Sequence, residues 1–142
     1  DLEKNRYISY AFDSKKFQTY DFVDMWVKYN DKDLKIDTMA GVLYFGDNKA
    51  LKNVDDCYKN QKHISDELLT VFKNAQKEGP SKRIFYEADP SGKSSYTDIY
   101  LDLDEKYQVV IACYDWSDEF LGIKEDHLYI SIRSKELSFW LN

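Results

Sequence analysis

The apolar residues of this chain recur with two different periods, and the point where the period changes constrains the fold most. Its first third holds three segments rich in β-branched and aromatic residues, separated by polar turns. In Phe22–Tyr29, for example, Val23, Met25 and Val27 alternate with residues of the opposite face, a pattern typical of a half-buried strand. The sequence therefore predicts three antiparallel strands, at Arg6–Phe12, Phe22–Tyr29 and Met39–Phe45.

From Val54 to Ala75 the apolar residues recur every three or four positions instead, which predicts an amphipathic helix. Asp55 and Asp56 suit its first turn, because carboxylates are favoured near the positive end of the helix dipole. Ser65 is followed by two acidic residues and is also a fair N-cap, so a break into two helices stays open. We expect Gly79-Pro80 to end the helix.

Four more strands and a short C-terminal helix after Ser134 complete the pattern. The strands are expected at Lys82–Ala88, Tyr96–Leu103, Tyr107–Tyr114 and His127–Arg133. Strands grouped on either side of one helix are typical of an α+β fold with a mainly antiparallel sheet. With 142 residues we expect a single domain. Six to seven strands in the order βββ-α-ββββ-α would pack on one long helix.

The two faces of the predicted sheet differ in chemistry. In Tyr96–Leu103, the side chains of Thr97, Ile99 and Leu101 share one face, which would pack on the helix. The second face carries aromatic and acidic side chains, among them Tyr96, Asp98, Tyr100, Asp102 and Trp26. Tyr107–Tyr114 is the most apolar segment, so we expect it in the interior of the sheet.

Charge and apolar runs exclude two classes of protein. The chain has 20 basic and 26 acidic side chains, a net charge of -6, and no basic run of the kind that binds nucleic acid. Its longest apolar run, Val109–Cys113, is far shorter than the ~20 residues that span a bilayer. A negative surface is better suited to a basic protein partner.

Cys57 and Cys113 permit one disulfide, which would join the helix to a strand. The numbering opens at Asp1 without an initiator methionine or an apolar leader, as removal of a signal peptide or trimming of the chain would leave it. We therefore expect an exported protein, periplasmic or secreted, with a Cys57–Cys113 bridge. In the cytoplasmic alternative the two cysteines would be small buried hydrophobic residues.

The sequence contains no recognisable catalytic or cofactor set. Cys57 and His63 are six residues apart in one helix, on nearly opposite faces, so they cannot form a nucleophile–base pair there. The five glycines lack the spacing of a phosphate-binding loop, and the four Cys and His residues are too scattered for a structural zinc site. We expect no catalytic residues, no metal and no cofactor.

Acidic clusters leave one enzymatic alternative open. Asp102, Asp104 and Glu105 lie at a hairpin, and Asp115, Asp118 and Glu119 lie after the apolar strand. Neither cluster has the glycine and terminal glutamate of an EF-hand loop. A carboxylate pair can act on a glycosidic bond, so a carboxylate-dependent hydrolase is the third alternative.

The loop after that strand combines acids with large aromatic residues. Tyr and Trp dominate the hot spots of protein interfaces, and flanking carboxylates would suit a Lys- and Arg-rich partner. Alternatively, Trp116 closes one end of the core. Exposure distinguishes the two, because a contact ring is exposed in the free protein and a core ring is buried.

The leading hypothesis is a non-catalytic binding or inhibitory protein. A small, acidic, single-domain chain without a catalytic set is similar in format to immunity proteins, which neutralise antibacterial toxins. The resemblance implies a basic toxin or effector as partner, inhibited by occlusion of its active site. The expected contact residues are Asp98, Tyr100, Asp102, Tyr114, Asp115, Trp116, Asp118 and Glu119. A carrier that curls its sheet around a small apolar ligand is the second alternative.

Overall fold

The predicted order of strands and helices is confirmed in a computed structural model, which describes residues 7–13, 19–47, 49–85, 89–119 and 124–141. The fold is α+β, with one antiparallel sheet and two helices. The elements are β1 (Tyr7–Asp13), β2 (Phe22–Lys28), β3 (Ile36–Tyr44), α1 (Val54–Val71), β4 (Gln76–Ile84), β5 (Ser95–Asp102), β6 (Tyr107–Asp115), β7 (His127–Ser134) and α2 (Lys135–Leu141).

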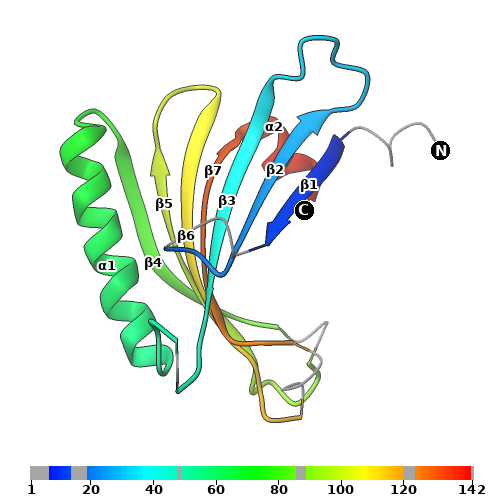
Figure 1. Cartoon of the computed structure of the whole chain (residues 1–142). Helices are drawn as coiled ribbons and strands as arrows, with labels where there is room; N and C mark the ends of the chain where they lie inside the picture. The colour runs from blue at the N-terminus through cyan, green and yellow to red at the C-terminus, as the bar shows by residue number, and fades with distance from the viewer. Residues whose placement is uncertain (1–6, 14–18, 48, 86–88, 120–123, 142) are drawn as a thin grey trace.

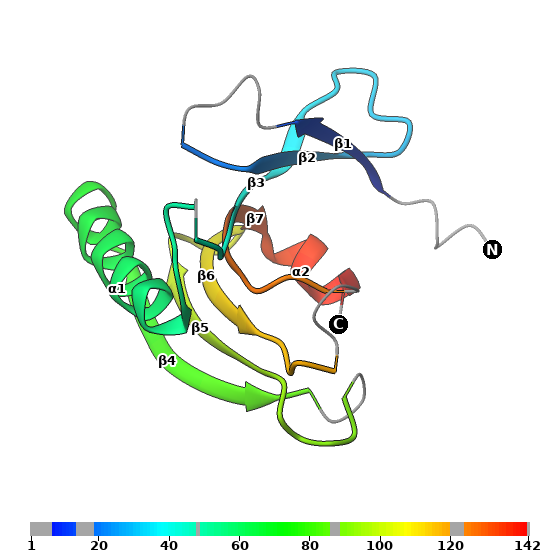
Figure 2. The same ribbon diagram turned by 60° about the horizontal axis from the view of Figure 1, so that its bottom comes forward.

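The sheet has seven strands in the order β1-β2-β3-β7-β6-β5-β4. Figure 1 shows α1 lying along one side of the sheet. In Figure 2 the sheet curves, so that β1 and β2 lie on one side of α2 while β5 and β6 lie on the other. Helix α1 therefore covers the convex face and α2 lies inside the curve. As its apolar sequence predicts, β6 is an interior strand, between β7 and β5.

The hydrophobic core lies between α1 and the convex face. Val109, Ile111 and Cys113 alternate along β6 toward α1, and all three are fully buried. Leu101 and Leu128 flank them from the neighbouring strands and are equally buried. Each such aliphatic side chain contributes about 1.5–3 kcal/mol on burial, so this layer holds the helix on the sheet.

Helix α1 is continuous through Ser65, so the alternative of two helices is wrong. Ser65 is fully buried against the sheet and begins no second helix. The N-cap is Asn53, whose side chain accepts the backbone N–H of Asp56 at 3.0 Å. The first turn holds Asp55 and Asp56, as the dipole argument predicts. The helix ends at Val71, four residues before the predicted Ala75.

Gly79-Pro80 does not end the helix, because both residues lie within β4. This strand begins at Gln76, six residues earlier than the predicted Lys82. A register shift between Glu78 and Ser81 accommodates the dipeptide, and an edge strand tolerates proline because its outer N–H groups need no partner. Gly79 has φ +89°, and a Cβ there would meet the Asp98 carbonyl oxygen at 2.6 Å.

The predicted cysteine pairing is supported by geometry. The two sulfur atoms of Cys57 and Cys113 are 2.06 Å apart, and both residues are fully buried. The bond joins α1 to β6 across 56 positions of sequence. No helix of the described residues is long and apolar enough to cross a membrane.

Replacing both cysteines should strongly destabilise the fold. Because the bond closes a loop of 56 positions, C57A/C113A is expected to lose about 4 kcal/mol of unfolding free energy by the loop-entropy relation. Urea unfolding of the variant and the parent measures this loss. Thiol titration of the unreduced, denatured parent is the control and should detect no free thiol; two free thiols would contradict the bond.

Candidate functional site

Small side chains lie in the middle of the concave face. The strand register aligns Ala40, Ser131 and Val110 in one row across β3, β7 and β6, with Ala112 in the next row. All four are buried. A hollow of about 330 Å³ remains inside the curve, where Val110 and Ala112 form part of its lining. Its remaining lining consists of Phe85, Tyr96, Asp98, Tyr100, Tyr114, Tyr129 and Arg133.

Asp98 is the most unusual residue of this concave hollow. It projects from the middle of β5 and is only 1 % exposed. Neither of its carboxylate oxygens accepts a hydrogen bond in the described part of the chain, and its nearest cation is Arg83, with Nε 3.7 Å from Oδ2. Burial raises the pKa of Asp98, and the opposing effects of Arg83, Tyr100 and Arg133 are smaller. The hollow therefore contains two strong acceptor atoms that make no hydrogen bond of 3.5 Å or shorter with the described residues, although the nearby Tyr100 hydroxyl favours the ionised form.

Two more charged groups have unused hydrogen-bonding atoms on this face. The Nε of Arg133 is buried and donates no hydrogen bond to a described residue, and the Oδ1 of Asp24 likewise accepts none. The register places Asp24 opposite Ala40, in the same row as Ser131. Burial raises the pKa of Asp24, although its contact with Trp26 lowers it. A ligand with a hydrogen-bond donor for Asp24 and an acceptor for Arg133 would satisfy these two groups.

Four tyrosines surround the charged groups: Tyr96, Tyr100, Tyr114 and Tyr129. Burial raises the pKa of Tyr114 to about 12 and raises that of Tyr129 as well. The hydroxyls of Tyr114 and Tyr129 are therefore protonated at neutral pH. His127 stacks on Tyr114 with ring centroids 4.5 Å apart, and burial lowers its pKa. The rings thus offer neutral aromatic faces and hydroxyl groups.

One end of the hollow is closed by an aromatic stack that includes Trp116. The Trp116 and Phe85 rings are 4.7 Å apart with 7° between their planes, and Phe85 also lies 4.6 Å from Tyr96. Trp116 is only 8 % exposed. This burial is the outcome expected if the ring closes the core, and it leaves little of the indole for contact with a partner.

The loop before β5 is held in place by Asp89. Its carboxylate accepts the N–H groups of Ser91 and Ser94 and the hydroxyl of Ser94, which in turn accepts the N–H of Ser117. These hydrogen bonds hold the pKa of Asp89 well below its usual value. The network ties the turn to the residue next to Trp116.

The structure brings together only part of the predicted contact set. Asp98, Tyr100 and Tyr114 line the concave hollow. Asp102 lies at the opposite end of β5 from Ser95 and pairs with Lys135, Nζ–Oδ2 3.1 Å.

The predicted residues after Tyr114 diverge from the hollow. Asp115 follows Tyr114 in β6, so its side chain points to the other face of the sheet. Its pKa is raised by burial and by Asp126. Asp118 and Glu119 are exposed in the loop, where Glu119 pairs with Lys93 at 3.3 Å.

The prediction missed Tyr129, Arg133, Arg83, Phe85 and Asp24. A signal existed for two of them: if Leu128, Ile130 and Ile132 face the core, then period-two alternation places Tyr129 and Arg133 on the other face. Alternation does not reveal which strands are neighbours, and it is β7 that links Asp24 of β2 to the hollow.

Comparison with models of protein families, with curated proteins and with solved structures finds no match for this chain. The protein is therefore classified by its own geometry: an α+β protein with one curved antiparallel sheet and a tyrosine-lined, charged hollow on its concave face.

Neutralising Asp98 should stabilise the protein at neutral pH. A carboxyl whose folded pKa lies above its unfolded value binds protons more tightly when folded, so its contribution to stability falls as pH rises through the interval between the two values. D98N removes this pH-dependent loss of folding stability, so the urea midpoint of the variant should exceed that of the parent at pH 7. The difference should shrink near pH 3.5, where Asp98 is largely protonated in both states.

The matched control is E67Q, which neutralises an exposed carboxylate on α1. The urea midpoint of E67Q should differ little from that of the parent at both pH values. A D98N variant that is less stable than the parent at pH 7, yet equal to it near pH 3.5, would show that ionised Asp98 stabilises the fold.

Proposed function

We propose that this is a non-catalytic binding protein of an oxidising, extracytoplasmic compartment, whose concave hollow receives a cationic side chain of a basic protein partner. The finer proposal is an immunity-type role, in which the partner is a toxin or effector whose active site the bound protein occludes.

The observation that carries this proposal is the buried Asp98 carboxylate within the ring of tyrosines. A carboxylate that is 1 % exposed and accepts no hydrogen bond from the described residues is costly in the free protein. A lysine or arginine side chain from a partner would offset that cost by pairing with it. Aromatic faces such as those of Tyr96 and Tyr100 also attract cations, by about 0.5–2 kcal/mol each.

The two arginines of the site, Arg83 and Arg133, leave the carboxylate of Asp98 without a close ion pair. Arg83 is 57 % exposed in its side chain and reaches Asp98 only through an ion pair of 3.7 Å, so it lies at the rim. The unused donor of Arg133, at Nε, needs an acceptor. A protein segment supplies both requirements, because its backbone carbonyls accept hydrogen bonds while a cationic side chain pairs with Asp98.

Long-range charge supports the same type of partner. The net charge of -6 favours encounter with a basic protein and disfavours acidic competitors. Asp118 adds exposed negative charge in the loop after β6, whereas the charge of Glu119 is paired with Lys93. Fields of this kind are screened by salt, which makes their contribution measurable.

The cysteine pair supports the proposed location in an oxidising compartment. Disulfides persist in oxidising compartments and are rare in the reducing cytosol. The pairing of Cys57 with Cys113 in the fully buried core supports the proposed placement outside the cytoplasm.

Affinity capture with matched baits tests the proposal. The parent protein should retain a basic protein from an extract of its source organism at low salt and release it at high salt. D98N should retain at least tenfold less, because the buried acceptor is gone, whereas E67Q should retain as much as the parent. Circular dichroism confirms that each bait is folded.

Two outcomes would contradict the proposal. A partner that D98N retains as well as the parent binds elsewhere on the surface. If the baits capture no protein, and a neutral small molecule binds the parent independently of salt but not D98N, then the hollow is a small-molecule site.

A further inference from the structure

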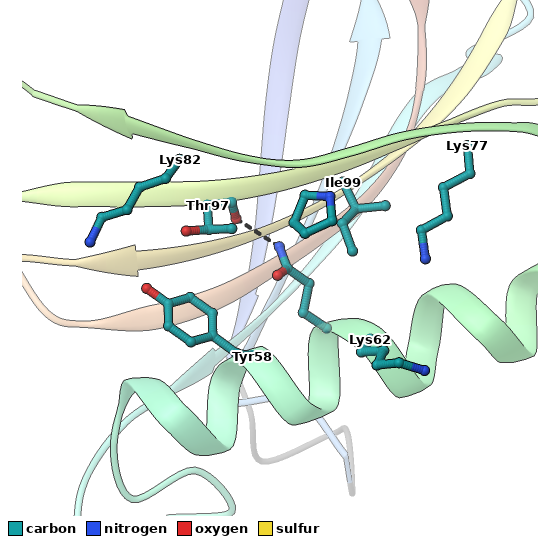
Figure 3. A pocket seen from close by; sticks show the side chains of 8 residues that line it. Tyr58, Lys62, Lys77, Lys82, Thr97 and Ile99 are labelled. Atoms are coloured by element: carbon teal, nitrogen blue, oxygen red, sulfur yellow. Dashed lines mark hydrogen bonds between the residues drawn. The ribbon is translucent and has the colours of Figure 1, made fainter.

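A second cavity lies on the convex side of the sheet, between α1 and the edge strand β4. Helix α1 packs mainly on β6, so it leaves a groove of about 550 Å³ above β4 and β5. This volume is within the roughly 300–1,000 Å³ of small-molecule sites. Tyr58 of α1 and Ile99 of β5 line it, as Figure 3 shows, together with Pro80 of β4. The lining of this α1–β4 groove is therefore largely apolar.

The groove has a fixed floor. The side-chain amide of Gln61, on α1, donates to the carbonyl oxygens of Thr97 and Ile111 at 2.7 and 2.8 Å (Figure 3 shows the bond to Thr97). One turn earlier in the helix, Cys57 is joined to Cys113 of β6. These links hold α1 at a set distance from the sheet. A preformed groove loses little ordering entropy when it binds a ligand.

Three lysines surround the opening. Figure 3 shows Lys82 at the end near Tyr58, with Lys62 and Lys77 at the other end. Asp66 contacts both Lys62 and Lys77, with N–O distances of 2.5 and 3.7 Å, and these contacts hold the pKa of Asp66 below its usual value.

Lys82 makes no ion pair within 4.0 Å in the described part of the chain, although its charge lowers the pKa of Asp115. Among the described residues, Asp66 is thus the only carboxylate within 4.0 Å of the three cations that border this groove, in a protein whose net charge is -6.

We propose that the α1–β4 groove binds an anionic single-chain amphiphile, a long-chain aliphatic carboxylate. The alkyl chain lies against Tyr58, Pro80 and Ile99. The carboxylate pairs with Lys82, which makes no ion pair within 4.0 Å with the described residues. This site is separate from the concave hollow and does not depend on the function proposed for it. It gives a location and a charge preference to the alternative of an apolar-ligand carrier.

Calorimetric titration of the intact, disulfide-bonded protein with dodecanoate below its micelle concentration tests the proposal. We expect one site. Decanoate should bind about tenfold more weakly, since each methylene buried in an apolar site contributes roughly a three- to fourfold factor. Dodecyltrimethylammonium, with the same chain and the opposite charge, should not bind measurably.

Lysine variants then locate the carboxylate. K82Q should lower the affinity for dodecanoate about two- to fivefold, the range of one partly exposed ion pair. K59Q is the control, because Lys59 is next to Tyr58 on α1 but lies outside the groove and pairs with Asp56. K59Q and D98N should bind dodecanoate as the parent does. Amide chemical shifts of Thr97 and Ile99 should change on titration.

Three results would overturn the proposal. The first is the absence of dodecanoate binding below the micelle concentration. The second is equal binding of dodecanoate and dodecyltrimethylammonium, or an equal loss in K59Q and K82Q. The third is binding to vesicles that contain anionic phospholipid without binding to monomeric dodecanoate, which would indicate a membrane-surface contact instead of a groove for a single chain.

Discussion

The packing of α1 on β6 is the interaction on which both cavities depend. Val109, Ile111 and Cys113 point from β6 toward the helix, and the bond from Cys57 holds the helix over this strand. Alternation then commits the intervening residues, Val110 and Ala112, to the opposite face. Helix α2 packs on that face only at one end, where the Gln108 side chain donates to the Ser138 hydroxyl at 2.6 Å. Over Val110 and Ala112 the curve stays hollow, with larger side chains around the opening.

The same placement of α1 explains why the two faces differ in chemistry. A helix centred on β6 leaves β4, the edge strand, without a packing partner on the convex side, so every residue of β4 is exposed. Lys77 and Lys82 lie there because an edge strand in contact with solvent favours lysine, which also discourages pairing with another chain. On the concave side, curvature brings Asp24 of β2 and Asp98 of β5 toward the same space. One face therefore presents cations around an apolar groove, and the other presents acids among tyrosines.

Most of the fold could be predicted because its strands alternate clearly and its helix has the other period. The face of β5 that carries Tyr96, Asp98 and Tyr100 follows from alternation alone. Strand β4 was placed too late because its exposed residues, with Gly79 and Pro80 among them, show no apolar pattern. Alternation left two interpretations of Trp116 open, a contact ring and a core ring, since its burial depends on Phe85, which comes from a distant segment. Sequence periodicity gives the face of a residue, whereas strand order and loop packing decide its neighbours.

Asp98 shows most clearly why the concave hollow is a candidate site and not merely a packing defect. A face that serves only stability would carry an apolar residue at this position, because burying an unpaired carboxylate costs free energy. Other buried polar side chains do have partners: Asp89 has its hydrogen bonds and Gln61 has two carbonyl acceptors, and the core is apolar. A local violation within an otherwise consistent structure is typical of functional positions, where stability is lost in exchange for binding. The unused atoms of Asp98 and Arg133 lie in one cavity with four tyrosines, so the violation is concentrated where a ligand could relieve it.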